Sequence, residues 1–302
     1  MKHIKKLYWL LFFSSLFLQA EEQVDIRQAL SGIVNQAFIA QEKQNQVIAL
    51  AARNKMLTQK MAKDAVKVYY DVERKKSYKD MLLSAKTFNR VLNGLKNGDP
   101  SLHITQAADE KVLKYVEEVY TVWRPFDAQV KKLQVDGKID KNAYHYILLN
   151  NEKLLRLSHK LTQTLKSESK LSTRFNEVVE HSLKIADRQR MLSQKMFKEK
   201  LLLFYHEDEE RNRARLRGSI ILFGNGLKGL IEGENRRGLV KIANKEIQVP
   251  LRKTWRIWKR IEGIYKKPTI SKKELQILEK YEPKLLEYSE EIVQDIEKSL
   301  DI

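Results

Sequence analysis

The chain has 302 residues, which is long enough for two domains with hydrophobic cores of their own. It contains 57 lysines and arginines against 39 aspartates and glutamates, and the formal net charge of +18 favours anionic partners such as small anions, acidic lipid headgroups or nucleic acid. The absence of cysteine excludes disulfides, a lipobox cysteine, a thiol nucleophile and a haem-attachment motif.

The first twenty residues have the pattern of a secretory signal peptide. Lys2, Lys5 and Lys6 precede an apolar run at 7–18 that is too short to span a bilayer, and a small residue, Ala20, follows. We therefore expect export, cleavage after about Ala20 and a periplasmic location, with an uncleaved N-terminal anchor as the alternative. Because export separates the protein from cytoplasmic nucleic acid, we expect no nucleic-acid partner.

Helical periodicity predicts four helices in the first half of the chain. The expected elements are a long helix at about 25–72, a second from Ser77 to the N-G-D-P turn at 97–100, a third at about 105–133 bent at Pro125, and a fourth after the V-D-G-K-I-D turn at 135–140.

The second half repeats this plan with one irregular stretch. The expected elements are a helix to about Tyr205, a second at about 210–231, a short hairpin at 238–249, a third helix with Pro250 in its first turn, and a fourth at about 271–300. No Gly or Pro lies between Gly137 and Gly218, so a long continuous helix could join the two halves. A break at 167–173 would instead let the halves lie side by side.

An eleven-residue segment occurs twice in the chain. Residues 186–196 read A-D-R-Q-R-M-L-S-Q-K-M and residues 51–61 read A-A-R-N-K-M-L-T-Q-K-M, so seven of eleven positions are identical at an offset of 135. The same offset pairs Phe88 with Phe223, Gly94 with Gly229 and Trp123 with Trp258; farther along, the register slips by four, as K-L-L at 153–155 meets K-L-L at 284–286. We interpret this as a duplication. The predicted fold is all-α, with two tandem antiparallel four-helix bundles at 21–166 and 167–302.

The repeated motif predicts a helix with two apolar sides, each of which carries basic residues. On a helical wheel, Arg188 and Lys195 fall in one apolar stripe, while Arg190 falls on the other side of the helix. One side should pack within its own bundle, which leaves the other for a helix of a partner chain or of the other module. A cation among apolar side chains costs free energy unless it is paired, and the planar fork of arginine suits a flat oxyanion. The alternative is that these cations only extend along the edge of a packed stripe.

The R-Q-R-M-L-S-Q-K-M segment after an I-A pair, the following F-x5-G-L helix and the tryptophan-bearing third helix resemble the periplasmic sensing domain of type IV pilus methyl-accepting chemotaxis transducers (PilJ-like). That domain is similar in turn to the nitrate/nitrite sensor domain of NarX-type histidine kinases. The resemblance covers essentially the whole chain after the first twenty residues, once per module.

The resemblance implies a ligand site. In the NarX-like members, the arginine immediately before the motif methionine binds nitrate or nitrite at the interface of two such helices. The matching residue is Arg190, and the equivalent position in the first copy is Lys55, which keeps the charge but loses the two-pronged geometry. The family's other basic motif positions, for which no ligand role is implied, correspond to Arg53, Lys60, Arg188 and Lys195.

Other chemistry has little support in the sequence. No histidine has a glutamate three residues before it, as a di-iron carboxylate bundle requires, and no Gly-rich phosphate loop or nucleophile elbow is visible. A Ser/His/Asp triad stays open at this stage. We expect no enzyme, no catalytic residues, no metal and no cofactor.

Two functions therefore remain as hypotheses. The first is an exported sensory protein that binds a small oxyanion at a helix–helix interface. Because the related receptors continue into a transmembrane helix while this sequence stops at Ile302, we expect a membrane-bound receptor or kinase partner, with a homodimer as a further possibility. The alternative is a basic docking module without a small-molecule ligand, which uses its positive surface to bind a membrane receptor, lipopolysaccharide or a pilus-related partner.

Overall fold

A computed structural model describes residue 36 and residues 42–168, 177–234 and 241–299. The expected signal peptide at 1–20 lies outside the described residues, as does most of the predicted first helix before residue 42. Residues 47–302 form one compact unit, and the description below concerns that unit.

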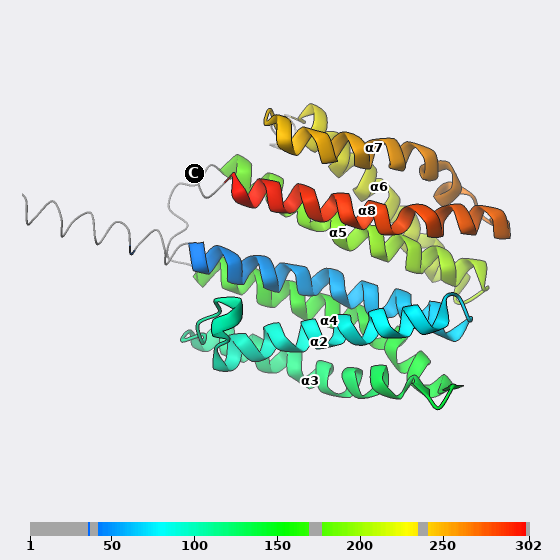
Figure 1. Ribbon diagram of the computed structural model, residues 1–302, viewed down its shortest axis with the longest axis horizontal. Helices are drawn as coiled ribbons and strands as arrows, with labels where there is room; N and C mark the ends of the chain where they lie inside the picture. The colour runs from blue at the N-terminus through cyan, green and yellow to red at the C-terminus, as the bar shows by residue number, and fades with distance from the viewer. Residues whose placement is uncertain (1–35, 37–41, 169–176, 235–240, 300–302) are drawn as a thin grey trace, which may run out of the picture. The chain divides into compact units, whose positions relative to one another are not determined.

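The fold is all-α, as the sequence predicts (Figure 1). The first described helix covers residues 42–69 and is called the first helix below. It is followed by α2 (Arg74–Asn97), a 3-10 turn η1 (Pro100–Leu102), α3 (Glu110–Lys132), the two-residue strands β1 (Gln134–Val135) and β2 (Lys138–Ile139), α4 (Lys141–Glu168), α5 (Glu177–Phe204), α6 (Glu209–Glu232), α7 (Lys245–Lys266) and α8 (Lys272–Lys298).

Each half of the chain packs its own helices around an aromatic pair at equivalent positions. In the first half Phe88 of α2 lies against Trp123 of α3, with ring centroids 4.3 Å apart. In the second half Phe223 of α6 lies against Trp258 of α7 at 4.8 Å. Within each half, α2 packs on α3 and α3 on α4, while α6 packs on α7 and α7 on α8. The 135-residue offset of the sequence is therefore repeated in the cores.

Helix ends follow local sequence signals that are also duplicated. Gly98 and Gly233 end α2 and α6 with positive φ values of 83° and 82°, which glycine adopts without strain. Ser271 begins α8 with a capping box, in which its hydroxyl accepts from the Glu274 backbone and the Glu274 carboxylate accepts from Ser271.

The expected hairpin at 238–249 is wrong where the structure describes it. Residues 245–249 belong to α7, and Asn244 is its N-cap, with the side-chain oxygen accepting from the Glu246 backbone 2.8 Å away. Asparagine suits turns and N-caps alike, so the alternation misled the prediction. Pro250 consequently lies inside α7, beyond its first turn. The described residues form their hairpin at 134–139 instead, around Gly137 at φ 78°.

The alternative of one continuous helix through both halves is also wrong. Lys198 of α5 places its amine 3.1 Å from a carboxylate oxygen of Glu152 on α4. In a straight helix these two residues would be roughly 70 Å apart at about 1.5 Å per residue. The two halves therefore lie side by side; residues 169–176, which include most of the expected break at 167–173, are outside the described residues.

Candidate functional site

The two copies of the motif lie on neighbouring helices, the first helix and α5. Tyr70 and Tyr205, at equivalent positions of the two copies, stack with ring centroids 3.6 Å apart and parallel planes. The contacts Lys63–Gln194 and Lys198–Gln59 join the same two helices at earlier positions of both copies, so the helices run in the same direction about an approximate two-fold axis. The second apolar side of each motif helix is thus covered by the other module, one of the two partners that the sequence allowed.

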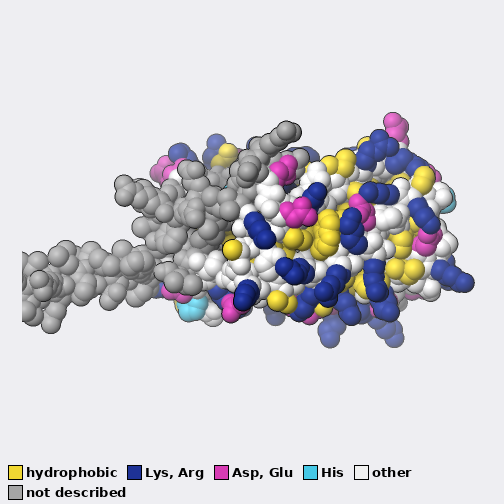
Figure 2. Space-filling model, turned by 90° about the horizontal axis from the view of Figure 1, so that it is seen from above, with side chains coloured by type: hydrophobic (Ala, Val, Ile, Leu, Met, Phe, Trp, Pro, Cys, Tyr) yellow, Lys and Arg dark blue, Asp and Glu magenta, His cyan; other side chains and the backbone are white. Residues whose placement is uncertain are grey.

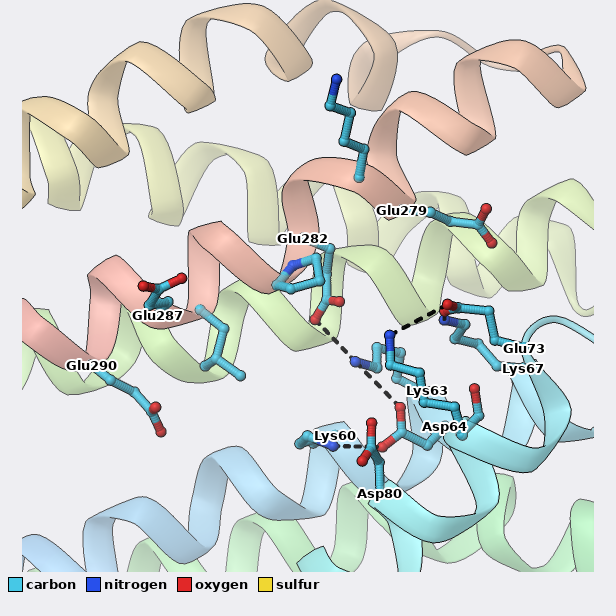
Figure 3. Close-up of a pocket in the computed structure, with 15 residues that line it drawn as sticks. Lys60, Lys63, Asp64, Lys67, Glu73, Asp80, Glu279, Glu282, Glu287 and Glu290 are labelled. Atoms are coloured by element: carbon cyan, nitrogen blue, oxygen red, sulfur yellow. Dashed lines mark hydrogen bonds and ion pairs between the residues drawn. The ribbon is translucent and has the colours of Figure 1, made fainter.

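A buried polar cluster, here called cluster A, joins the modules on one side of this axis (Figure 3). The amine of Lys63 donates to Gln194 at 2.9 Å and to Glu282 at 3.0 Å, and Gln194 donates to the same glutamate oxygen at 2.6 Å. Asp64 also lies 3.3 Å from the Lys63 amine. Burial alone would lower the pKa of Lys63, but Asp64 and Glu282 raise it above the usual lysine value. Lys63 is therefore fully charged, and its contacts join the two modules.

The equivalent residues form cluster B on the other side of the axis. Lys198 donates to Gln59 at 2.7 Å and to Asn151 at 2.9 Å. Asn151 stands where Glu282 stands in cluster A, so the negative charge here comes from the next residue, Glu152, 3.1 Å from the amine. Burial would raise the pKa of Glu152, but the nearby Lys198 and Lys195 lower it to about 2.

Two of the six sequence candidates take part in these clusters. Lys60 lies 2.8 Å from Asp64, and Lys195 lies 2.8 Å from Glu152 and 3.4 Å from Glu199. Both lysines are therefore neutralised by carboxylates of the protein itself.

Arg53 and Arg188 also occupy equivalent positions. Arg53 is exposed and donates to Glu290 of α8 at 3.1 Å, an ion pair between the two modules, and Arg188 is half-buried. The contact of Arg53 belongs to the junction between modules and gives no sign of a ligand.

The remaining two candidates, Arg190 and Lys55, have unused hydrogen-bond donors. Arg190 is 5 % exposed, and one terminal nitrogen of its guanidinium pairs with Asp187 of the same helix. Its Nε is buried and has no hydrogen-bond partner among the described residues. The ammonium of Lys55 is half-buried and makes no hydrogen bond or ion pair within the described part of the chain.

The charge of Arg190 acts on Lys55 across the two motif helices. Burial lowers the pKa of Lys55; Asp187 raises it, while Lys166, Arg190 and Lys184 lower it further. One carboxylate thus faces several positive charges in a partly dry location between the two motif helices. Such a place favours an additional anion.

The hollow beside cluster A differs in charge balance from the surroundings of Lys55 and Arg190 (Figure 3). Its volume is about 510 Å³, and it is lined by the first helix, α2 and α8. Its lysines are largely paired internally: Lys60 with Asp64, and Lys67 with Glu73 at 2.6 Å. The lining holds more carboxylates than lysines, so the hollow does not offer the surplus positive charge found near Lys55 and Arg190.

Sequence reasoning missed the central lysines of the two clusters, Lys63 and Lys198. Its motif ended at Met61 and Met196, two residues before these lysines. The signal was present, because both copies contain a glutamine and a lysine four residues apart, Gln59 with Lys63 and Gln194 with Lys198. A buried glutamine and lysine in both copies on one helix face indicate a conserved polar junction between the copies.

The architecture defines a pair of helical modules, and a comparison with family models supplies the family. The chain belongs to the PilJ family, described as the N-terminal domain of type IV pili methyl-accepting chemotaxis transducers; the match covers residues 38–146 and 171–274, one region per copy. The family consists of non-catalytic sensory domains that are typically periplasmic. Neither the curated proteins nor the solved structures contain a match. In the described part of the chain, no helix combines the length and apolar character needed to cross a bilayer.

Proposed function

We propose that this chain is an exported sensory protein that binds a small oxyanion, with nitrate or nitrite preferred, between Lys55 and Arg190. The observation that carries the proposal is the buried Nε donor of Arg190, which lacks a partner among the described residues. A buried donor without an acceptor costs about 1–3 kcal/mol, and a bound oxyanion would remove that cost.

Three features support an oxyanion rather than another ligand. The guanidinium of Arg190 is a planar fork suited to a trigonal anion. Lys55 adds a second positive charge from the other module, and its desolvation strengthens any contact with an anion. The two residues occupy equivalent motif positions on parallel helices, which matches the interface that the resemblance to NarX-type sensors implies.

The position of this site also suggests how a bound state would be read. An anion held by Lys55 and Arg190 would bridge the first helix and α5, the same two helices that clusters A and B join. Binding would therefore shift how the two modules are held together. A membrane-bound receptor or kinase that contacts both modules would sense that shift.

Calorimetric titration with nitrate and nitrite tests the proposal, with chloride and sulfate as comparison anions at two ionic strengths. We expect one anion per chain, because both cations serve a single site. Arg190→Lys should weaken binding by retaining the charge without the fork, and Arg190→Ala should abolish it. Arg256→Ala, which removes an exposed guanidinium on α7, serves as the control and should leave the affinity unchanged. Equal affinity of wild type and Arg190→Ala would refute the proposal.

The docking function has a separate observation in its favour, the charge of α7. This helix carries seven lysines and arginines against two glutamates, whereas its counterpart α3 carries five against four acidic residues. Figure 2 views the molecule from above relative to Figure 1, which is the side on which α7 lies, and this face shows many Lys and Arg side chains and few carboxylates. If this face docks on anionic lipid, sedimentation with vesicles should depend steeply on salt and on Arg252 and Arg256, but not on Arg190. Indifference to vesicle charge would exclude docking on anionic lipid.

A further inference from the structure

One carboxylate of the motif, Asp187, lies among the cations of the proposed site, and the sequence analysis gave it no role. Asp187 is 6 % exposed and pairs with a terminal nitrogen of Arg190 one turn along α5. Its negative charge also acts on Lys55 from the other module. Asp187 is thus the counter-ion that the folded chain itself supplies to both basic residues.

The duplication shows that packing does not require an acid here. The equivalent residue of the first copy is Ala52, which is 3 % exposed and belongs to the buried core. A methyl group therefore fills this position on the first helix. The acid at 187 adds a charge beyond what the repeated fold needs.

Asp187 and an oxyanion would compete for the same donor. The carboxylate is itself a planar oxyanion, and it occupies one terminal nitrogen of the Arg190 guanidinium while Nε stays unpaired. A trigonal anion that engages a guanidinium through two parallel hydrogen bonds needs adjacent nitrogens of the fork. A guanidinium has five N–H groups, so an anion that leaves Asp187 in place can still reach a free N–H, but it then binds beside a like charge; an anion that displaces Asp187 gains the whole fork.

We infer that Asp187 is an internal competitor that sets the affinity and selectivity of the anion site, because a bound anion either displaces its carboxylate from Arg190 or lies beside a like charge. This inference rests on the proposed function. It adds that the Asp187 carboxylate occupies part of the site when no ligand is present. The wild type therefore binds the anion more weakly than Arg190 and Lys55 would without Asp187.

Neutralising Asp187 tests the inference. Asp187→Asn keeps the shape of the side chain, and Asp187→Ala reproduces the residue of the first copy. Each variant of the full chain is titrated calorimetrically with sodium nitrate and sodium nitrite after its thermal unfolding shows that it folds. Glu180→Gln, an exposed position two turns earlier on α5, changes the net charge equally without touching Arg190.

We expect both Asp187 variants to bind nitrate or nitrite about 10- to 100-fold more tightly than wild type, the range of one charge-assisted hydrogen bond, with Glu180→Gln unchanged. Binding by the Asp187 variants alone, with none by wild type, would also support the competitor role. Wild-type binding that either variant fails to improve would overturn the inference and leave the proposed function standing. No binding by wild type or by either variant would overturn both.

Discussion

Glu282→Gln tests whether cluster A holds the two modules together. The side chains of Glu282 and Lys63 are each 6 % exposed, and the substitution leaves the lysine ammonium with Gln194 and with Asp64 at 3.3 Å. Removal of one partner of a buried pair costs about 3–5 kcal/mol, and the remaining contact with Asp64 places this case near the lower end, at about 3 kcal/mol. For a chain of this size that loss lowers the melting temperature by about 6–12 °C.

Thermal unfolding followed by circular dichroism at pH 7 measures this effect, with two comparison variants. Glu117→Gln removes an exposed partner of Lys96 and should change the melting temperature far less, because surface pairs contribute little. The double variant Lys63→Met with Glu282→Met replaces the pair by apolar side chains of similar length, and we expect it to recover most of the loss. A drop for Glu282→Gln no larger than that for Glu117→Gln would refute a buried, charged junction.

Three further predictions concern single titratable groups. Glu152, with its pKa lowered to about 2, contributes about 3 kcal/mol of stability that is present above about pH 4.5 and lost as the pH falls through 2. Urea unfolding of wild type and Glu152→Gln between pH 2 and 5 should show their unfolding free energies converging at low pH. Burial also lowers the pKa of Lys55, so its charge destabilises the fold at neutral pH. Lys55→Met should therefore be more stable than wild type, and the difference in unfolding free energy should shrink as the pH rises toward the pKa of free lysine. A difference independent of pH would contradict this reasoning. Lys200 is buried, donates to the backbone carbonyls of Tyr265 and Lys267, and has its pKa lowered by burial to about 8. Because the unfolded chain binds more protons than the folded chain above that pH, the stability of wild type relative to Lys200→Met should rise between pH 8 and 10. Parallel pH profiles of the two proteins would refute this prediction.

The repeated motif predicted the fold class and the equivalence of the two halves, because helical periodicity and a duplicated core pattern depend on local sequence. The cores confirm this through the Phe88–Trp123 and Phe223–Trp258 pairs. The sequence left the side-by-side arrangement as one of two alternatives. Contacts such as Lys198 with Glu152 join residues far apart in the chain, and they leave no periodic signal in the sequence.

The candidate site was predictable only in part. The motif identified Arg190 and Lys55 as equivalent cations, and in the structure the charge of Arg190 acts on Lys55. The motif could not show that Lys60 and Lys195 would be neutralised by Asp64 and Glu152, since those pairs depend on rotamers and on a neighbouring module. The identity of the ligand stays a prediction, and so does the export of the chain.

The approximate two-fold arrangement of the modules affects how such a protein can evolve. In a homodimer every substitution appears twice, so both halves of an interface must change together. Here the halves are covalently linked, and the linkage keeps their effective concentration high even when individual contacts weaken. Each half can therefore mutate alone, as Asn151 opposite Glu282 and Ala52 opposite Asp187 show. A fused pair of modules can present one asymmetric site that a symmetric pair of identical chains could not build.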